Sequence, residues 1–337
     1  MVEPILSVRD LVTYFRPEEG VVRAVDGASF DLHAGRTLGI VGESGCGKSV
    51  TARSILRIVE RPGRVEGGEI LLRRADGRVV DLAKLDDKSQ EMRNIRGGAI
   101  GYIFQEPMSS LSAFHTVGNQ IIEAIRLHRK LTAKEARERA IELLQLVGIP
   151  QPQQRVDSYS FELSGGLRQR VMIALALAAE PGILIADEPT TALDVTTQAQ
   201  ILELIRRLQA ERHLAVILIT HDMGVIAEMA DSVAVMYLGK IVESGPVDAI
   251  FHAPRHPYTQ ALLRSIPSVL AAPRSRLATI AGSIPHPYAR PPGCPYYPRC
   301  HSFMAGVCDK STPPVNRIDA AHEVRCFLYG AATETAA

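Results

Sequence analysis

Apolar runs with a strand period alternate with helical patterns along most of the chain, and this alternation predicts an α/β fold. Two runs rich in β-branched residues, 5–15 and 21–32, flank a polar turn and predict an antiparallel pair. A second hairpin is predicted at 68–72 and 78–82 because Asp76-Gly77 joins its two runs. Further short apolar runs predict buried strands at 37–41, 99–104, 183–186, 215–220, 233–237 and 240–243.

Helical spacing dominates from about residue 106 to residue 180. Thr132 and Glu135 form a capping-box pattern, and Ser164 is expected to be the N-cap of a helix that ends near Ala179. Another helical pattern, between Ile201 and Leu208, separates two of the predicted strands. Strands that alternate with helices predict a parallel sheet covered on both faces.

The texture of the chain changes beyond about Gly245, where prolines become dense and amphipathic periodicity mostly disappears. We therefore predict one domain over residues 1–250, with a helical subdomain over about 106–180, and a small loop-rich domain over 251–337. Such a segment has too little apolar periodicity to fold alone, so we expect a cross-link to stabilise it.

The composition is that of a soluble globular protein, and the charge limits the classes of partner that the chain is expected to bind. The 337 residues are 46% hydrophobic and 22% charged, and the net charge of +1 gives no electrostatic reason to expect nucleic acid or an anionic membrane surface. The N-terminus lacks the pattern of a signal peptide, and the longest apolar stretch, 171–179, is far shorter than the roughly 20 residues of a membrane span. We expect a cytoplasmic chain that reaches a membrane only through partners.

The strongest motif is the sequence GESGCGKS, which directly follows the apolar run 37–41. It fits the phosphate-loop pattern G-x-x-x-x-G-K-[ST] with a strand before it and a helix after it. Lys48 is expected to reach the β- and γ-phosphates of a nucleoside triphosphate, and the Ser49 hydroxyl to bind Mg²⁺. A glycine-rich turn without function is the alternative, and the strand, lysine and serine together argue against it. The residues predicted to bind the nucleotide here are Gly42, Glu43, Ser44, Gly45, Cys46, Gly47, Lys48 and Ser49.

Two carboxylates follow the apolar strand at 183–186. Asp187 is expected to hold Mg²⁺, directly or through water, and Glu188 to polarise the water that attacks the γ-phosphate. Alone, such a pair is more often the solvated start of a helix. The presence of Lys48 and Ser49 in the same chain favours the catalytic interpretation.

Other polar and aromatic residues also stand where ligands bind in α/β sheets. Gln105 ends a predicted strand, where its amide oxygen could contact Mg²⁺ or the attacking water, and His221 ends another, where it could contact the γ-phosphate. The alternative for His221 is a structural histidine bonded to loop carbonyls. Phe15 or Tyr14 could stack on the base, although burial in a strand is the commoner fate of such aromatics.

Ser164, Gly165 and Gly166 open a helix with a hydroxyl and unshielded N–H groups, which is an anion-binding arrangement. Serine as a plain N-cap is the alternative. The order of the phosphate loop, Gln105, LSGG at 163–166, ADEPT at 186–190, ALD at 192–194 and His221 resembles that of ATP-binding cassette (ABC) ATPases.

This resemblance implies two cassettes that sandwich two ATP molecules, with Ser164, Gly165 and Gly166 acting on the partner's nucleotide. It implies a cassette with a mixed core sheet, an antiparallel β subdomain and a helical subdomain, with Asp194 at the cassette interface and Phe15 as the adenine-stacking aromatic. The chain departs from many members at Leu167, where glutamine is common, and this puts contacts on the ribose side in doubt.

The sequences HPYTQALLRSIP and GCPYYPRC resemble the ATPase subunits of oligopeptide and dipeptide importers over nearly the whole chain. The implied partners are a second ATPase subunit, generally a paralogue in a heterodimer, two transmembrane permeases and an extracytoplasmic solute-binding protein. Residues near 106–120 would receive the permease's coupling helix. The implied location is peripheral, on the cytoplasmic face of the inner membrane. Nickel chelates, glutathione and sugars remain alternative cargoes.

The four late cysteines have the spacing C-x₅-C-x₇-C-x₁₇-C, which is not the C-x₂-C pattern of zinc sites. Their ligand type suits an iron–sulfur cluster as well as zinc, and free thiols or disulfides remain open. The importer resemblance implies a structural 4Fe–4S cluster at Cys294, Cys300, Cys308 and Cys326, which would make the C-terminal domain a metal-cluster domain.

Rival functions use the same ATPase core on nucleic acid or the ribosome. DNA-repair cassettes carry a long coiled-coil insertion before the signature, and the short segment between Gln105 and Leu163 leaves no room for one. Ribosome-associated members carry two cassettes in one chain, and this chain has one. An exporter or a lone regulatory ATPase is a third possibility, and the resemblance of the proline-rich cysteine segment to importer subunits argues against it. Transport therefore remains the leading hypothesis.

Overall fold

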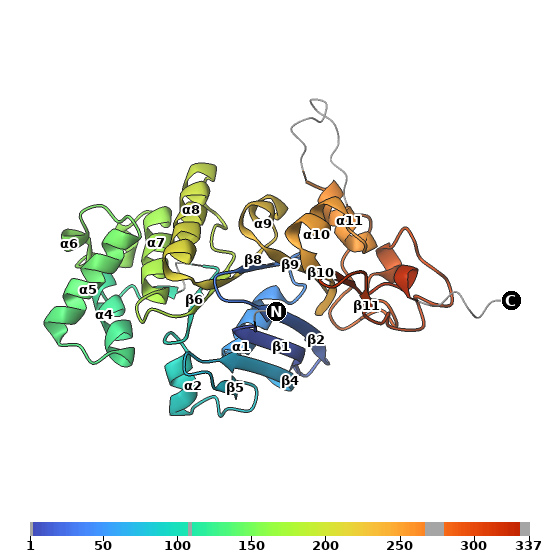
Figure 1. Cartoon of the computed structure of the whole chain (residues 1–337), viewed down its shortest axis with the longest axis horizontal. Helices are drawn as coiled ribbons and strands as arrows, with labels where there is room; N and C mark the ends of the chain where they lie inside the picture. The colour runs from blue at the N-terminus through green and yellow to red at the C-terminus, as the bar shows by residue number, and fades with distance from the viewer. Residues whose placement is uncertain (1–2, 107–109, 267–279, 331–337) are drawn as a thin grey trace. The chain divides into compact units, whose positions relative to one another are not determined.

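The computed structural model of the chain describes residues 3–106, 110–266 and 280–330 (Figure 1). These residues form two compact units. The first contains Leu32–Thr37, Leu71–Ile219 and the residues before Ser7, and the second contains Ser7–Asp31, Leu38–Ile70 and the chain from Thr220 onward.

Parallel strands form the core of the first unit. β6 pairs with β7 and β7 pairs with β8, so that Tyr102 lies opposite Ile185, and Ile185 opposite Ile217. Every residue of β7 and β8 is buried, as expected for strands covered on both faces. The strands are β5 (Val79–Asp81), β6 (Ile100–Ile103), β7 (Ile183–Asp187) and β8 (Ala215–Thr220).

Helices of the first unit follow the predicted pattern between residues 106 and 180, and α4, α5 and α7 pack against one another (Figure 1). The predicted capping box is present: the Thr132 N–H donates to the Glu135 carboxylate at 2.8 Å, and the Glu135 N–H donates to the Thr132 hydroxyl. The helices are α2 (Gln90–Ile95), α4 (Val117–His128), α5 (Ala133–Leu146), α6 (Pro152–Arg155), α7 (Gly165–Ala176) and α8 (Val195–Arg212), with a 3₁₀ turn η1 (Ser160–Glu162).

The second unit contains the antiparallel strands predicted at 5–15 and 21–32 and the strand before the phosphate loop, whereas β5, the second strand of the other predicted hairpin, belongs to the first unit. β3 pairs in parallel with β9, and β9 pairs with β10 through a turn in which Leu238 (φ 43°) and Gly239 (φ 78°) are both left-handed. Two left-handed central residues define the type I′ turn that suits a tight hairpin. The strands are β1 (Leu6–Phe15), β2 (Val22–Leu32), β3 (Thr37–Val41), β4 (Gly63–Arg73), β9 (Ser232–Tyr237), β10 (Lys240–Pro246), β11 (Asn316–Arg317) and β12 (Glu323–Val324). The helices are α1 (Lys48–Ile55), α9 (Met223–Met229), α10 (Val247–His252) and α11 (Pro257–Arg264), with 3₁₀ turns η2 (Tyr297–Arg299) and η3 (Phe327–Tyr329).

The proline-rich segment beyond residue 250 is joined closely to the rest of its unit. β12 pairs antiparallel with β10, with Val324 opposite Glu243, and β11 pairs with β12. α10 and α11 occupy a stretch in which the sequence predicted little periodic structure. The domain boundary near residue 250 stays a prediction, but the segment beyond it contributes strands to the sheet that contains β9 and β10.

A buried carboxylate, that of Glu243, joins three parts of this segment to β10. It accepts hydrogen bonds from the Arg255 N–H at 2.6 Å and the His256 N–H at 2.9 Å, and it contacts the His322 Nε2 at 2.8 Å. The Glu243 side chain is fully buried and that of His322 is 3% exposed. Buried charges are tolerated only where they are paired and hydrogen-bonded, as here.

Replacing Glu243 by Ala is therefore expected to destabilise the folded chain by about 3 kcal/mol, because it leaves two buried N–H groups and a buried imidazole without their acceptor. Urea denaturation followed by circular dichroism measures this loss. The control is Glu66→Ala, which removes an ion pair between Glu66 and the exposed Arg16 and should change the midpoint little. Equal midpoints for the two variants would contradict the role of Glu243.

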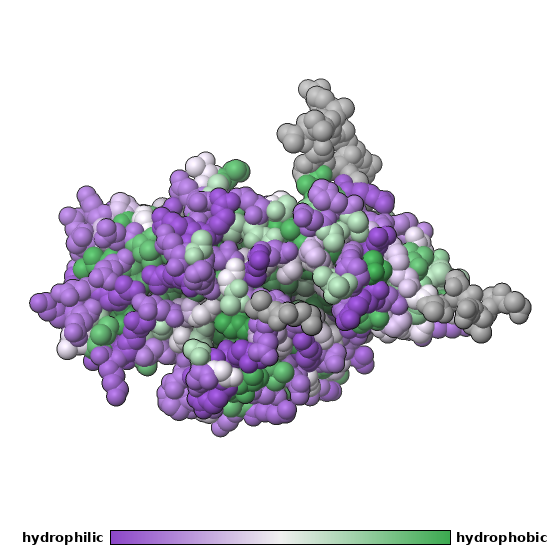
Figure 2. All heavy atoms as spheres, viewed as in Figure 1, coloured by the Kyte–Doolittle hydropathy of each residue, from purple (hydrophilic) through white to green (hydrophobic). Residues whose placement is uncertain are grey.

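No helix within the described ranges is long and apolar enough to cross a membrane. On the face drawn in Figure 2, hydrophobic residues appear in separate groups among hydrophilic ones.

Candidate functional site

The phosphate loop is shaped by glycines with left-handed backbone. Gly42 (φ 152°) and Gly47 (φ 107°) each approach another backbone so closely that a Cβ would lie 2.2 Å from the Met236 carbonyl oxygen or 2.1 Å from that of Ala24. No other residue fits either position without moving the chain. β3 is buried at all five positions and delivers the chain into the loop, and α1 begins at Lys48.

The Lys48 side chain lies over the loop. It is 4% exposed, and its Nζ donates to the carbonyl oxygens of Gly42 at 2.8 Å and Glu43 at 3.2 Å. Cys46, in the middle of the loop, is buried, and burial raises the pKa of its thiol to about 11. It is therefore a neutral packing residue and no nucleophile. Ser44 and Gly45 are exposed, and Ser49 is half-buried at the start of α1.

The two carboxylates at the end of β7, Asp187 and Glu188, have different environments in the first unit. Asp187 is 1% exposed and accepts a hydrogen bond from the Tyr102 hydroxyl at 2.8 Å. Glu188 is 8% exposed and left-handed (φ 48°), and its Oε2 accepts from the Gln105 Nε2 at 3.1 Å and the Thr191 hydroxyl at 2.9 Å. The structure thus brings the predicted residues Gln105 and Glu188 together.

Two further residues of this group were missed from the sequence. Tyr102 lies on β6 opposite Ile185 of β7, and this pairing, which brings it to Asp187, was not predicted from the sequence. Thr191 follows Glu188 by three residues, within the run ADEPTT. Among the predicted Mg²⁺ ligands, Gln105 and Asp187 belong to the first unit, whereas Ser49 belongs to the second.

The signature loop opens α7 as predicted. Ser164 is the N-cap, and its hydroxyl accepts from the Leu167 N–H at 3.4 Å. Gly166 lies against the start of α8, since a Cβ there would come within 2.7 Å of the Thr197 side chain. Asp194 caps α8 by accepting from the Thr197 N–H at 3.0 Å. Ser164, Gly165 and Asp194 are exposed, so they are accessible to a partner.

The other residues predicted to contact the nucleotide, Phe15 and His221, belong to the second unit. Phe15 ends β1 and rests on the backbone of Gly63, where a Cβ would lie 2.6 Å from its ring. The hydroxyl of the neighbouring Tyr14 donates a hydrogen bond to the Asp26 carboxylate at 2.6 Å, so this side chain has a partner within the protein. His221 is exposed and directly precedes Asp222, the N-cap of α9.

The four late cysteines line one small pocket, together with apolar side chains such as Met304 and Leu328. Burial raises the pKa of Cys294 to about 12 and that of Cys326 to about 11, and it also raises the pKa of Cys300. Within the described ranges, no group of three or more His, Cys, Asp or Glu side chains is placed so that it could hold a metal ion. The positions of these side chains therefore do not establish the predicted metal-cluster domain, although its four cysteines line the same pocket.

Comparison with known proteins places these motifs in a family. Residues 25–191 match the family model described as ABC transporter, and residues 242–308 match that of the oligopeptide/dipeptide transporter C-terminal region. The dipeptide transport ATP-binding protein DppD of Bacillus subtilis is 48% identical over 99% of this chain and 97% of its own length. The chain belongs to the ABC transporter family. The resemblance inferred from the sequence motifs is thereby confirmed.

Other relatives of this ABC ATPase agree. A putative peptide import ATP-binding protein of Brucella melitensis is 48% identical over 97% of this chain and 98% of its own, and DppD of Escherichia coli is 46% identical over 96% of both. Among solved structures, the dimeric bacterial ABC transporter cassette MJ0796 has a TM-score of 0.63 and 27% identity, covering 72% of this chain and 98% of its own. A post-hydrolysis dimer of the same cassette bound to ADP and phosphate also has a TM-score of 0.63, with 26% identity over 72% of this chain and 98% of its own. The predicted cassette fold, with mixed and antiparallel sheets and helices, is therefore confirmed.

Proposed function

We propose that this ABC ATPase hydrolyses ATP to power the import of peptides or related small solutes across the cytoplasmic membrane. The observation that carries the proposal is the near full-length similarity to dipeptide transport ATP-binding proteins, together with the C-terminal region that matches oligopeptide/dipeptide transporters. The partners are a second ATPase subunit, a paralogue in a heterodimer, two permeases and an extracytoplasmic binding protein. The chain works on the cytoplasmic face of the inner membrane.

In this function the loop from Gly42 to Ser49 binds the phosphates of ATP, with Lys48 on the β- and γ-phosphates and Phe15 against the adenine. Ser49, Gln105 and Asp187 are the residues that would hold Mg²⁺, and the ion would supply positive charge against the phosphates. Glu188 accepts the proton of the attacking water. Its hydrogen bonds from Gln105 and Thr191 support this role because they orient the carboxylate. His221 contacts the γ-phosphate.

The signature loop acts on the nucleotide of the partner cassette. Ser164, Gly165 and Gly166 donate N–H groups and a hydroxyl to that γ-phosphate, and Asp194 lies at the same interface. Ser164 and Gly165 are exposed, and Gly166 packs on α8, the helix that Asp194 caps. These observations support one interface formed by the signature loop and the residues around Asp194. ATP closes the two cassettes and hydrolysis reopens them, which moves the permeases between their inward-facing and outward-facing states.

The permease contact is supported by exposed aromatic side chains near residues 106–120, of which 107–109 lie outside the described ranges. Phe114 is 91% exposed and Phe161 is 62% exposed, and a β-bridge between Thr116 and Tyr159 connects their segments. Tyr159 stacks on Phe161 with ring centroids 5.4 Å apart. Exposed apolar side chains gathered in one place mark an interaction surface, here for the coupling helix of a permease.

Reconstituted transport tests the proposed function. The chain is purified with the gene products co-transcribed with it, placed in proteoliposomes, and supplied with ATP and a labelled dipeptide on the binding-protein side. ATP-dependent accumulation of the dipeptide is the expected result. Accumulation of a nickel chelate, glutathione or a sugar instead of the dipeptide would show that the importer carries a different cargo but belongs to the same family. ATPase activity stimulated by nucleic acid or ribosomes, with no uptake, would replace the transport function by the rival one.

The cysteine pocket is the site of a 4Fe–4S cluster with a structural role in this proposal. Four thiols around one pocket with an apolar lining are a donor set that iron–sulfur clusters use, and Cys294, Cys300, Cys308 and Cys326 would be the ligands. The cluster would cross-link a segment with few periodic apolar residues, and binding it would require loss of the thiol protons.

Anaerobic purification followed by iron and acid-labile sulfide analysis is expected to find about four of each per chain, as a 4Fe–4S cluster requires. Replacing Cys308 by Ser should lower both contents together and lower the thermal midpoint. Cys46→Ser serves as the control because Cys46 lies in the phosphate loop, so iron and sulfide should stay unchanged. Zinc without iron in the native chain would overturn the cluster and replace it by the zinc alternative.

A further inference from the structure

The phosphate loop is held by a residue far along the chain. Arg299, which directly precedes Cys300, donates from Nη1 to the Glu43 Oε2 at 2.7 Å and from Nη2 to the Glu43 Oε1 at 3.0 Å. Such two-point pairing between a guanidinium and a carboxylate fixes orientation as well as distance. Glu43 is the second residue of the loop, and 256 positions separate it from Arg299.

The environment of Arg299 leaves this guanidinium little freedom. Its side chain is 3% exposed, its Nε donates to the Ala281 carbonyl oxygen at 2.9 Å, and its Nη1 also reaches the Tyr237 hydroxyl at 3.4 Å. Burial disfavours its charged form, but the hydrogen bonds to Glu43 and Tyr237 outweigh this effect and raise its pKa. Arg299 is therefore a buried, permanently charged partner for the loop.

A second contact from the same region fixes the backbone of Glu43. Its N–H donates to the hydroxyl of Tyr258, a fully buried residue of α11, at 2.9 Å. The Tyr258 ring packs against those of Tyr237 and Tyr296, with centroids 4.7 and 5.3 Å away. The same Glu43 offers its carbonyl oxygen to Lys48 at 3.2 Å. Glu43 thus connects the C-terminal region to the lysine of the phosphate loop.

We propose that Arg299 is a positioning residue for ATP binding, which holds Glu43 so that the loop and Lys48 are arranged to receive the triphosphate. The proposal rests on the proposed function of this loop. A glycine-rich loop loses much conformational freedom on binding, so a preformed shape lowers the cost of binding. In addition, an unpaired carboxylate on the loop would repel the phosphates, and Arg299 compensates its charge. The cysteine segment that carries Arg299 is in this way part of the nucleotide site.

The test measures MgATP affinity and ATPase kinetics of full-length variants. Arg299→Met is expected to raise the Kd for MgATP about tenfold or more, as for loss of a charged hydrogen-bonded partner. The KM should rise in parallel while kcat at saturating ATP stays close to that of the parent. Arg299→Lys keeps the charge and should restore part of the affinity. The double variant Glu43→Gln with Arg299→Met should bind better than Arg299→Met alone, because no unpaired carboxylate remains.

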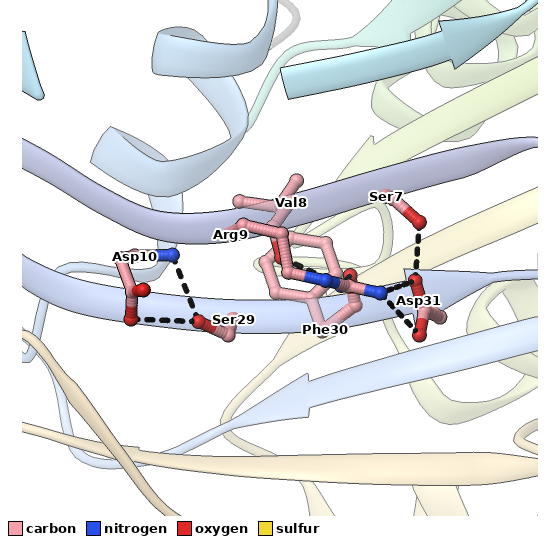
Figure 3. Close-up of polar contacts among 7 residues, drawn as sticks. All are labelled: Ser7, Val8, Arg9, Asp10, Ser29, Phe30 and Asp31. Carbon is pink, nitrogen blue, oxygen red and sulfur yellow. Dashed lines mark hydrogen bonds and ion pairs between the residues drawn. The ribbon is translucent and has the colours of Figure 1, made fainter. Parts of the chain in front are cut away.

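A matched control exists in the same unit. Arg9 of β1 pairs with both carboxylate oxygens of Asp31 on β2, at 2.7 and 2.8 Å (Figure 3), and neither residue belongs to the phosphate loop. Arg9→Met should leave the Kd for MgATP unchanged. If Arg299→Met does not fold, Glu43→Gln and Tyr258→Phe decide the question, since the first removes the negative charge that pairs with Arg299 and the second removes the hydroxyl that accepts from the Glu43 N–H, and both keep the size of the side chain.

Wild-type affinity in folded Glu43→Gln and Tyr258→Phe, with Lys48→Ala unable to bind, would overturn the positioning role alone. Wild-type affinity in all of these variants, Lys48→Ala included, would instead overturn the proposed nucleotide site. A fall in kcat at unchanged KM would also contradict positioning for binding.

Discussion

Glu188→Gln is expected to bind MgATP as the parent chain does and to hydrolyse it about 10²- to 10⁴-fold more slowly, the range that general-base catalysis contributes. Glutamine keeps the size of the side chain and can still contact Gln105 and Thr191, but it cannot accept the proton of water. The measurement is single-turnover hydrolysis together with equilibrium binding of MgATP. Because hydrolysis reopens the cassettes, the variant should also accumulate as a closed, ATP-bound dimer in size-exclusion chromatography.

The control for this prediction is Glu203→Gln on the exposed face of α8, where the carboxylate is 61% exposed and pairs with Arg206. Its turnover should match that of the parent. Near-normal turnover in Glu188→Gln would remove Glu188 from the role of general base and leave it an orienting residue.

Lys48→Ala is expected to lose MgATP affinity by about 100-fold or more, because a charged hydrogen-bond donor to the phosphates disappears. The structure adds a second reason for this loss. Without the ammonium group, the carbonyl oxygens of Gly42 and Glu43 lose the hydrogen-bond donor that they share. Isothermal titration with MgATP measures the affinity.

Lys84→Ala provides the control, since Lys84 is 72% exposed and pairs with Asp81 outside the phosphate loop. Its affinity should equal that of the parent. Unchanged affinity in Lys48→Ala itself would show that the loop does not bind the triphosphate through this side chain.

Local signals in the sequence predicted the elements that surround the candidate site. The phosphate loop, the capping box at Thr132 and the N-cap at Ser164 each depend on residues a few positions apart, so their physical causes are visible in a short window. The hairpin turn at Leu238-Gly239 is of the same kind. The order of the motifs then sufficed to indicate the family, which the relatives confirmed.

The helices beyond residue 245 were hidden because proline was taken as a sign of irregular structure. α11 begins at Pro257, the first helical position, where proline lacks only an N–H that would be unpaired in any case. His256 caps this helix, as its Nδ1 accepts from the Tyr258 N–H at 3.0 Å. Proline therefore starts this helix. A high density of prolines does not by itself distinguish a helix start from an irregular segment.

Contacts between distant parts of the chain could not be predicted from residue spacing. Arg299 and Glu43, or His322 and Glu243, meet only because the folded backbone brings their segments together. Tyr102 meets Asp187 for the same reason: its strand was predicted, but the pairing of β6 with β7 was not. The motif predicted Glu43 as a nucleotide-binding residue, but it gave no indication that the Glu43 carboxylate pairs with Arg299.

The short strand β12 also bears on how the protein behaves at high concentration. β10 pairs with β9 on one side and with β12 on the other, so its N–H and C=O groups face a strand of the same chain on both sides. An open strand edge is a template on which strands of other molecules can assemble. Detachment of β12 would expose such an edge along Glu243 and Ser244. β12 therefore covers this part of the edge of β10 with a strand of the same chain.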